Sequence, residues 1–183
     1  NSNTNDLDNV TAVETITLGD AATAVTTVNA LVANGATLTV DATALTTGSS
    51  TLTWTGSLEA DGKFSVTGGD NNDTILGGAG ADTIDGAAGN DSITAGAGAD
   101  SIVGGANDDT IVLAGNLTVA DTIAGGTGTD TLTFTDANSN TNDLDNVTAV
   151  ETITLGDAAT AVTTVNALVA NGATLTVDAT ALT

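Results

Sequence analysis

The chain has 183 residues, of which 23 are acidic and one, Lys63, is basic, so its formal net charge is −22. This charge disfavours nucleic acid and anionic membranes as partners, and it predicts that the folded chain needs bound cations. The absence of Cys and His excludes disulfides, thiolate metal sites and catalysis through imidazole. Because no run of about eighteen apolar residues is present, we expect no membrane insertion.

Short stretches that alternate polar and apolar residues characterise residues 1–67. They are TITL at 15–18, TLTV at 37–40, TLTW at 51–54 and KFSV at 63–66. Alternation with a period of two predicts strands that bury one face, and turn residues such as Asn, Asp and Gly separate them. We therefore expect residues 1–67 to form an irregular β-solenoid segment.

Two parts of this segment allow local alternatives. Residues 20–35 combine a capping Asp, spaced apolar residues and a final Gly, which is compatible with a short helix. Their Thr and Val content disfavours a helix, so we favour a strand and a corner. The Asp61-Gly62 pair could close a two-residue hairpin.

The first nine residues, NSNTNDLDN, are similar in composition to a calcium-binding loop. They lack the glycine at the sixth position and the glutamate at the twelfth that an EF-hand requires, so a polar solenoid loop is the preferred interpretation. Asp6 and Asp8, with their later copies Asp143 and Asp145, remain candidates for contact with an ion.

Residues 68–133 repeat a nine-residue unit of the form G-G-x-G-x-D-x-U-x, where U is a large aliphatic residue. Copies such as GGDNNDTIL and GGAGADTID place a glycine-rich turn before a short strand with one inward aliphatic side chain. One twelve-residue variant precedes the last unit. The seven units carry the aspartates Asp73, Asp82, Asp91, Asp100, Asp109, Asp121 and Asp130.

Two such units would complete one turn of about eighteen residues, so that alternate units stack about 4.8 Å apart. The expected aspartate pairs are Asp73 with Asp91, Asp82 with Asp100, Asp91 with Asp109, Asp100 with Asp121, and Asp109 with Asp130. Carboxylates together with loop carbonyls can supply the roughly six to eight oxygen ligands that calcium takes. The carbonyls expected to contribute are those of Gly68, Gly69, Gly77, Gly78, Gly80, Gly86, Gly89, Gly96, Gly98, Gly104, Gly105, Gly125, Gly126 and Gly128. Five pairs predict on the order of five calcium ions per module.

The repeated unit closely resembles the RTX (repeats-in-toxin) nonapeptide family. The resemblance implies a parallel β-roll that binds calcium between stacked loops. The expected fold is therefore all-β: a calcium-binding RTX β-roll continuous with less regular β-helix coils. Asn71, Ala87, Ala95 and Asn107 depart from the glycine positions of the family, and the insertion at 116–119 disturbs the spacing of the sixth unit.

A second resemblance concerns the order of segments along the chain. Alternating strands followed by nonapeptides are similar to the repeat regions of bacterial surface-layer proteins and large RTX adhesins. This resemblance implies type I secretion, an extracellular or cell-surface location, and calcium-dependent folding outside the cell.

The chain also contains a long exact repeat, because residues 1–46 recur unchanged at 138–183, an offset of 138 − 1 = 137. Residues 134–183 therefore begin the next module of a tandem array. Such an array suits a structural module of an extracellular filament or surface layer that self-associates into a filament or lattice. The alternative is the extender stalk of a large RTX adhesin, with a cell-surface polysaccharide as a further candidate partner. We expect no enzyme, because the chain lacks His, Cys, Arg and Tyr.

Overall fold

The computed structural model describes residues 12–21, 23–27, 31–114, 117–135, 144–156, 168–169 and 173–180. Fifteen strands and no helix occur in these residues, and all strand pairs are parallel. Consequently, nothing in the described part of the chain is a helix capable of spanning a membrane. The prediction of an all-β parallel solenoid is confirmed.

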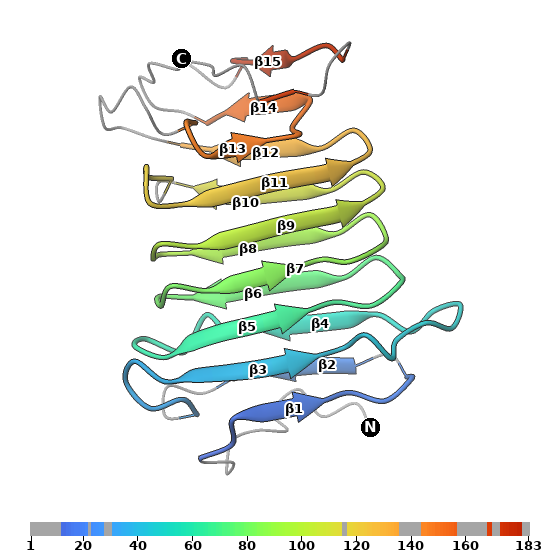
Figure 1. Cartoon of the computed structure of the whole chain (residues 1–183), viewed down its shortest axis with the longest axis vertical. Coiled ribbons are helices and arrows are strands. Elements are labelled where there is room, and N and C mark those ends of the chain that lie inside the picture. Colours follow the sequence, from blue (N-terminus) through green and yellow to red (C-terminus); the bar gives the residue numbers. More distant parts are fainter. Residues whose placement is uncertain are drawn as a thin grey trace.

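The strands form two sheets that face each other, and from β1 to β14 the chain alternates between them (Figure 1). One sheet contains β1 (Thr15–Thr17), β3 (Thr37–Asp41), β5 (Lys63–Thr67), β7 (Thr83–Asp85), β9 (Ser101–Ala106), β11 (Thr122–Thr127) and β13 (Val147–Thr148). The other contains β2 (Thr23–Thr26), β4 (Leu52–Thr55), β6 (Thr74–Gly78), β8 (Ser92–Gly96), β10 (Thr110–Ala114), β12 (Thr131–Phe134), β14 (Thr152–Leu155) and β15 (Thr176–Asp178). From β1 to β14, each coil of the solenoid thus contributes one strand to each sheet, whereas β14 and β15 pair within the eight-stranded sheet.

The register between strands reproduces the nonapeptide period. Ile75 pairs with Ile93 in the neighbouring coil, and Ile93 pairs with Ile111. The twelve-residue unit lengthens the next coil, so that Ile111 pairs with Leu132. The D-x-U tripeptide of each unit therefore pairs with the tripeptide two units earlier, in the adjacent coil, as the sequence predicts.

The core lies between the two sheets and consists mainly of stacked aliphatic side chains. The inward residues of the nonapeptides are all buried: Ile75, Ile84, Ile93, Ile102, Ile111, Ile123 and Leu132. Trp54 and Phe64, on β4 and β5, fill the wider coil below them, with their rings edge to face at 5.2 Å. A single layer of side chains per coil leaves each coil dependent on its two neighbours for burial.

The predicted strands of residues 1–67 are present as β1, β3, β4 and β5. Within residues 20–35 the structure has β2 and no helix among the described positions, while residue 22 and residues 28–30 lie outside them. The hairpin at Asp61-Gly62 does not form, because β4 and β5 belong to different sheets. The inward apolar residues of both strands need two opposed sheets, which a hairpin would not provide.

The solenoid continues across both predicted segment boundaries. β5 pairs with β7 across the end of the segment 1–67, and β12 pairs with β14 across the end of the segment 68–133. The irregular coils, the nonapeptides and the start of the next module therefore share the same two hydrogen-bonded ladders.

Candidate metal centre

The seven motif aspartates form two columns, because each one immediately precedes a strand of the stacked coils. The long column runs along the eight-stranded sheet and contains Asp73, Asp91, Asp109 and Asp130. The short column runs along the seven-stranded sheet and contains Asp82, Asp100 and Asp121. The structure brings together the same five pairs that the nonapeptide spacing predicts.

A hydrogen bond joins the two members of each pair. In the long column, the amides of Asp73, Asp91 and Asp109 donate to Oδ1 of the next aspartate at 2.7, 2.8 and 2.9 Å. In the short column, the amides of Asp82 and Asp100 donate in the same way at 2.9 and 2.8 Å. One carboxylate oxygen of each aspartate thus extends the backbone ladder from one coil to the next.

The columns begin at residues that the nonapeptide pattern does not include. The amide of Leu52 donates to Oδ1 of Asp73 at 2.7 Å, and the amide of Phe64 donates to Oδ1 of Asp82 at 2.8 Å. The irregular coils are therefore tied to the nonapeptide coils by the same type of bond.

All seven carboxylates are buried, with no more than 2% of any residue exposed. Desolvation, together with the like charges of Asp109 and Asp73, raises the pKa of Asp91 to about 7 in spite of the hydrogen bond from the Asp73 amide. Desolvation likewise raises the pKa values of Asp100 and Asp109 to about 6. The pKa values of Asp73, Asp82 and Asp130 are also raised by burial.

The second carboxylate oxygen differs along the columns. Oδ2 of Asp73 and of Asp82 accept amide hydrogen bonds from Gly69 and Gly78 at 2.7 and 2.9 Å. By contrast, Oδ2 of Asp91, Asp109 and Asp130 is buried without a hydrogen-bond partner in the structure. A buried carboxylate oxygen without a donor is costly, and a cation is the partner that would compensate it.

A glycine lies directly beside each of these unpartnered oxygens. A Cβ on Gly86 would lie 2.5 Å from Oδ2 of Asp91, and a Cβ on Gly104 would lie 2.6 Å from Oδ2 of Asp109. Each such Cβ would also collide with a carbonyl oxygen of the next coil, that of Gly104 or of Gly125. Carboxylate and carbonyl oxygens of successive coils therefore lie close to each other, and these hard oxygen donors fit calcium.

Backbone carbonyls would have to supply most of the ligands. No group of three or more acidic side chains that could hold an ion occurs within the described residues. Among the glycines predicted to contribute carbonyls, Gly68, Gly77, Gly86, Gly104 and Gly125 lie beside the carboxylates. Positive φ values occur at the ends of strands for Gly96, Gly105 and Gly126, and between strands for Gly89, Gly98 and Gly128. A Cβ on Gly80 would collide with the Gly62 carbonyl. The carbonyls of Gly69 and Gly78 accept amide bonds from Ala88 and Ala97 at 3.1 and 3.0 Å.

Glu151 extends the long column and was missed by the sequence analysis. Its Oε2 accepts the amide of Asp130 at 3.0 Å, as the aspartates do in the coils below. The spacing could have revealed it, because Glu151 follows Asp130 by 21 residues, the same interval as from Asp109 to Asp130. Thr118, which donates its amide to Oδ2 of Asp121 at 2.7 Å, was missed too.

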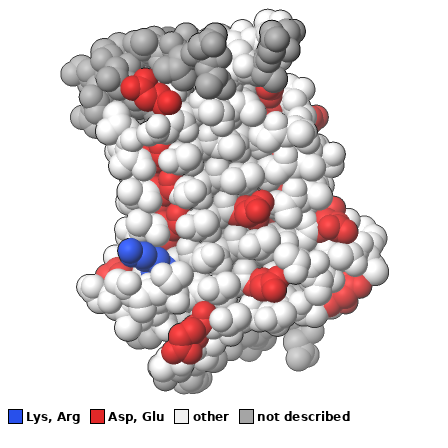
Figure 2. All heavy atoms as spheres, in the orientation of Figure 1, with Lys and Arg blue, Asp and Glu red and all other residues white. Residues whose placement is uncertain are grey.

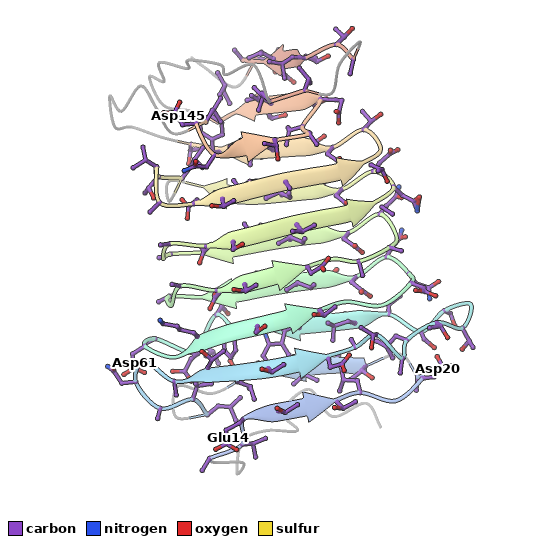
Figure 3. The ribbon with its side chains drawn as sticks, in the orientation of Figure 1. Glu14, Asp20, Asp61 and Asp145 are labelled. Atoms are coloured by element: carbon purple, nitrogen blue, oxygen red, sulfur yellow. The ribbon has the colours of Figure 1, made fainter. Side chains whose placement is uncertain are left out.

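The candidates outside the nonapeptides do not join the columns in the described structure. Asp145 is exposed in the turn before β13 (Figure 3), and Asp6, Asp8 and Asp143 lie outside the described residues. Other acidic residues are spread over the surface in Figure 2, where the one basic patch is Lys63 because the chain has no other basic residue. Negative charge therefore occurs both inside and outside the solenoid, with little cationic charge from the protein to balance it.

The structure thus defines a class of protein, a parallel β-solenoid with buried carboxylate columns between its coils. The family model described as the RTX calcium-binding nonapeptide repeat (4 copies) matches residues 65–93, 86–115 and 120–134. The chain therefore carries RTX nonapeptide repeats, which bind calcium and occur generally in secreted bacterial proteins. Searches of curated proteins and of solved structures gave no match.

Proposed function

We propose that the chain is a calcium-stabilised structural module of a secreted bacterial protein, repeated in tandem to build an extracellular filament or surface layer. The observation that carries this proposal is the set of buried, unpartnered Oδ2 atoms of Asp91, Asp109 and Asp130. A divalent cation between successive coils would neutralise these stacked carboxylates and join the coils.

The ligands proposed for these ions are the seven motif aspartates and the loop carbonyls of the glycine-rich turns. Each stacked pair would provide carboxylate oxygen from the long or the short column. With five pairs, we propose on the order of five ions per module. Because the sites form only when coils stack, the free energy of binding calcium would add directly to the stability of the folded module.

This coupling makes calcium a folding switch in the proposed function. At low calcium the closely spaced carboxylates repel one another, which disfavours the folded solenoid. In a calcium-rich medium outside the cell, the same carboxylates hold ions and the coils stack. The parent chain would thus be kept unfolded for type I secretion and would fold at the cell surface.

The second candidate function is that of an extender stalk in a large RTX adhesin. The exact recurrence of residues 1–46 at 138–183 supports both candidates, because filaments and stalks alike gain length from identical modules. In the filament the modules also self-associate, whereas in the stalk a separate domain binds the target, for example a cell-surface polysaccharide. We propose no catalytic role for either.

Calcium titration of the chain, first stripped with a chelator, tests the proposal. Trp54 is the only tryptophan and is buried beside Phe64, so its fluorescence reports folding together with circular dichroism. We expect cooperative folding in calcium and a much weaker response to magnesium, which prefers a smaller octahedral site. Absence of calcium binding, or an equal response to both ions, would reject the calcium function.

Asp91→Asn gives a more specific version of this test. The substitution keeps an acceptor at Oδ1 for the Asp73 amide but removes the charge that would hold the ion. We expect the calcium concentration at half-folding to rise several-fold. Asp70→Asn is the matched control, because Asp70 is exposed and outside both columns, and it should titrate like the unmodified chain. Electron microscopy of the parent protein in calcium would then separate uniform fibres or lattices from rods with a terminal head.

A further inference from the structure

Where both copies of the repeated sequence are described, they form the same pair of adjacent parallel strands. β1 corresponds to the first three residues of β14, 137 positions later, and the paired segments of β3 and β15 correspond in the same way. In the first copy Thr15 pairs with Thr39, and in the second Thr152 pairs with Thr176. The repeated sequence therefore pairs its two strands in the same register at both ends of the solenoid.

The two copies nevertheless lie in opposite sheets. β1 belongs to the seven-stranded sheet and β14 to the eight-stranded sheet. From β1 to β14 the chain alternates between the sheets, and β14 is 14 − 1 = 13 strands after β1, an odd number. One module therefore spans six and a half coils, with two strands to a coil.

The copies also differ in what covers them. In the second copy β12 lies against β14, with Leu132 opposite Ile153 and Phe134 opposite Leu155. Ile153 is fully buried there, whereas its counterpart Ile16 in the edge strand β1 is only partly buried. The row of apolar residues along β1 therefore lacks the covering strand that its copy has, within the described part of the chain.

Two further pairs of equivalent residues also show that the second copy is covered by a preceding coil and the first copy is not. A Cβ on Gly156 would collide with the side chain of Thr135 in the preceding coil, whereas a Cβ on the equivalent Gly19 would meet nothing within 4 Å. Glu151 accepts the amide of Asp130 at 3.0 Å, whereas the equivalent Glu14 is exposed at the end of the solenoid (Figure 3). The second copy thus shows what each residue of the first would contact beneath another module.

We propose that β1 is the docking strand for β12 of a preceding copy of the same module, and that modules joined in this way are related by a half turn about the solenoid axis. In this junction Leu132 packs on Ile16, Phe134 packs on Leu18, and Glu14 receives the amide of Asp130. The inference rests on the tandem array of the proposed function, but it does not depend on the binding of calcium.

The half turn has a consequence for the whole array. Six and a half coils at about 4.8 Å each advance the axis by roughly 31 Å per module. The long column, which follows the eight-stranded sheet in one module, would follow the opposite sheet in the next. Lys63 and every other surface group would likewise recur on alternating sides, so the array would present the same features on two opposed faces.

The junction is tested by the same substitution at the two equivalent glycines. In the 183-residue chain, Gly156→Ala should lower the thermal midpoint by roughly 2–4 °C or more, while Gly19→Ala should leave it unchanged. The second chain to be measured carries one additional module, a copy of residues 1–137, before its first residue. In that chain Gly19→Ala should lower the midpoint as Gly156→Ala does. If Gly19→Ala stays neutral there, β1 is covered by something other than the preceding module and the proposal is wrong.

The half turn is tested by spin labels on introduced cysteines, since the chain has none of its own. Labels at Ser101 and Thr122, which are paired in the seven-stranded sheet, are the control and should show strong dipolar broadening. Labels at Thr122 and Thr154 should show none, because the second copy places Thr154 in the opposite sheet. Broadening in both pairs would place β14 in the sheet of β1 and would refute the half turn, whatever the outcome of the calcium titration.

Discussion

The backbone amide of Asp91 donates a hydrogen bond to Oδ1 of Asp109, which lies 18 residues later and one coil further along the solenoid. This bond explains why one residue type recurs at the position. A carboxylate has two oxygens. In Asp91, Asp109 and Asp130 the first completes the ladder between strands, while the second has no hydrogen-bond partner and is available to an ion. The aspartate is therefore both part of the backbone hydrogen-bonding pattern and a candidate ligand.

The first prediction concerns the stability of the chelated protein as a function of pH. Burial raises the pKa of Asp91 to about 7 and those of Asp100 and Asp109 to about 6, whereas in the unfolded chain these groups titrate near 3.9. Between about pH 4 and pH 7 the folded state therefore binds more protons than the unfolded state. The free energy of unfolding without calcium should fall as pH rises through this window, and urea unfolding at pH 4.5 and pH 7.5 measures it.

Saturating calcium should remove most of this pH dependence near neutrality, since ion and proton compete for the same carboxylates. At pH 7.5 the protein with calcium should be more stable than the chelated protein, and the difference should shrink on acidification. A chelated protein whose stability rises from pH 4.5 to pH 7.5 would contradict the raised pKa values.

The second prediction concerns the glycine beside Asp109. Gly104→Ala would introduce a Cβ 2.6 Å from Oδ2 of Asp109 and in collision with the carbonyl oxygen of Gly125. Because both oxygens would have to move apart, we expect a loss of about 1–3 kcal/mol of stability and a weaker response to calcium. Denaturant unfolding with and without calcium measures both effects. The control is Gly19→Ala in the same chain, where the added Cβ meets nothing within 4 Å.

The third prediction concerns a departure from the glycine pattern that carries backbone strain. Ala87 has a φ of 74°, a left-handed conformation that is unfavourable for a residue with a Cβ. Ala87→Gly should therefore stabilise the chain, although the greater freedom of glycine in the unfolded state reduces the gain to about 0.5–1 kcal/mol. The midpoint of urea unfolding measures the change. Ala88→Gly is a suitable neighbour for comparison, since it carries no positive φ and should be neutral or destabilising.

The nonapeptide coils could be predicted almost completely from the sequence, and the reason is physical. A fixed period of nine, combined with one strand per unit and a constant strand spacing, leaves only one way to stack the coils. The pairing of Ile75 with Ile93 and of Asp73 with Asp91 follows from that constraint alone. Where the spacing lengthens, at the twelve-residue unit, the pairing of Ile111 with Leu132 still follows because the D-x-U order is kept.

The sequence revealed less about the direction of the side chains. The nonapeptide pattern predicts aspartates in ion-binding loops, but it does not predict that Oδ1 accepts the amide of the preceding coil. That bond depends on a rotamer and on burial, neither of which the period determines. Glu151 was missed for a related reason, because it lies outside the nonapeptides and differs in residue type, although its interval of 21 residues from Asp130 continues the column.

The last prediction concerns the thin core. Ile93 is fully buried between its in-register neighbours Ile75 and Ile111, and one side chain per strand is all that fills each layer. Ile93→Ala should cost about 2–5 kcal/mol, and Ile93→Val about 0.5–1.5 kcal/mol, because the cavity would lie between two coils that cannot approach further while their backbones remain paired. Trp54 fluorescence during urea unfolding measures both variants. Val103→Ala is the control, since Val103 is 38% exposed on the outer face of β9 and its truncation should change stability by less than about 0.5 kcal/mol. Equal effects at the two sites would mean that the coils do not share a packed core.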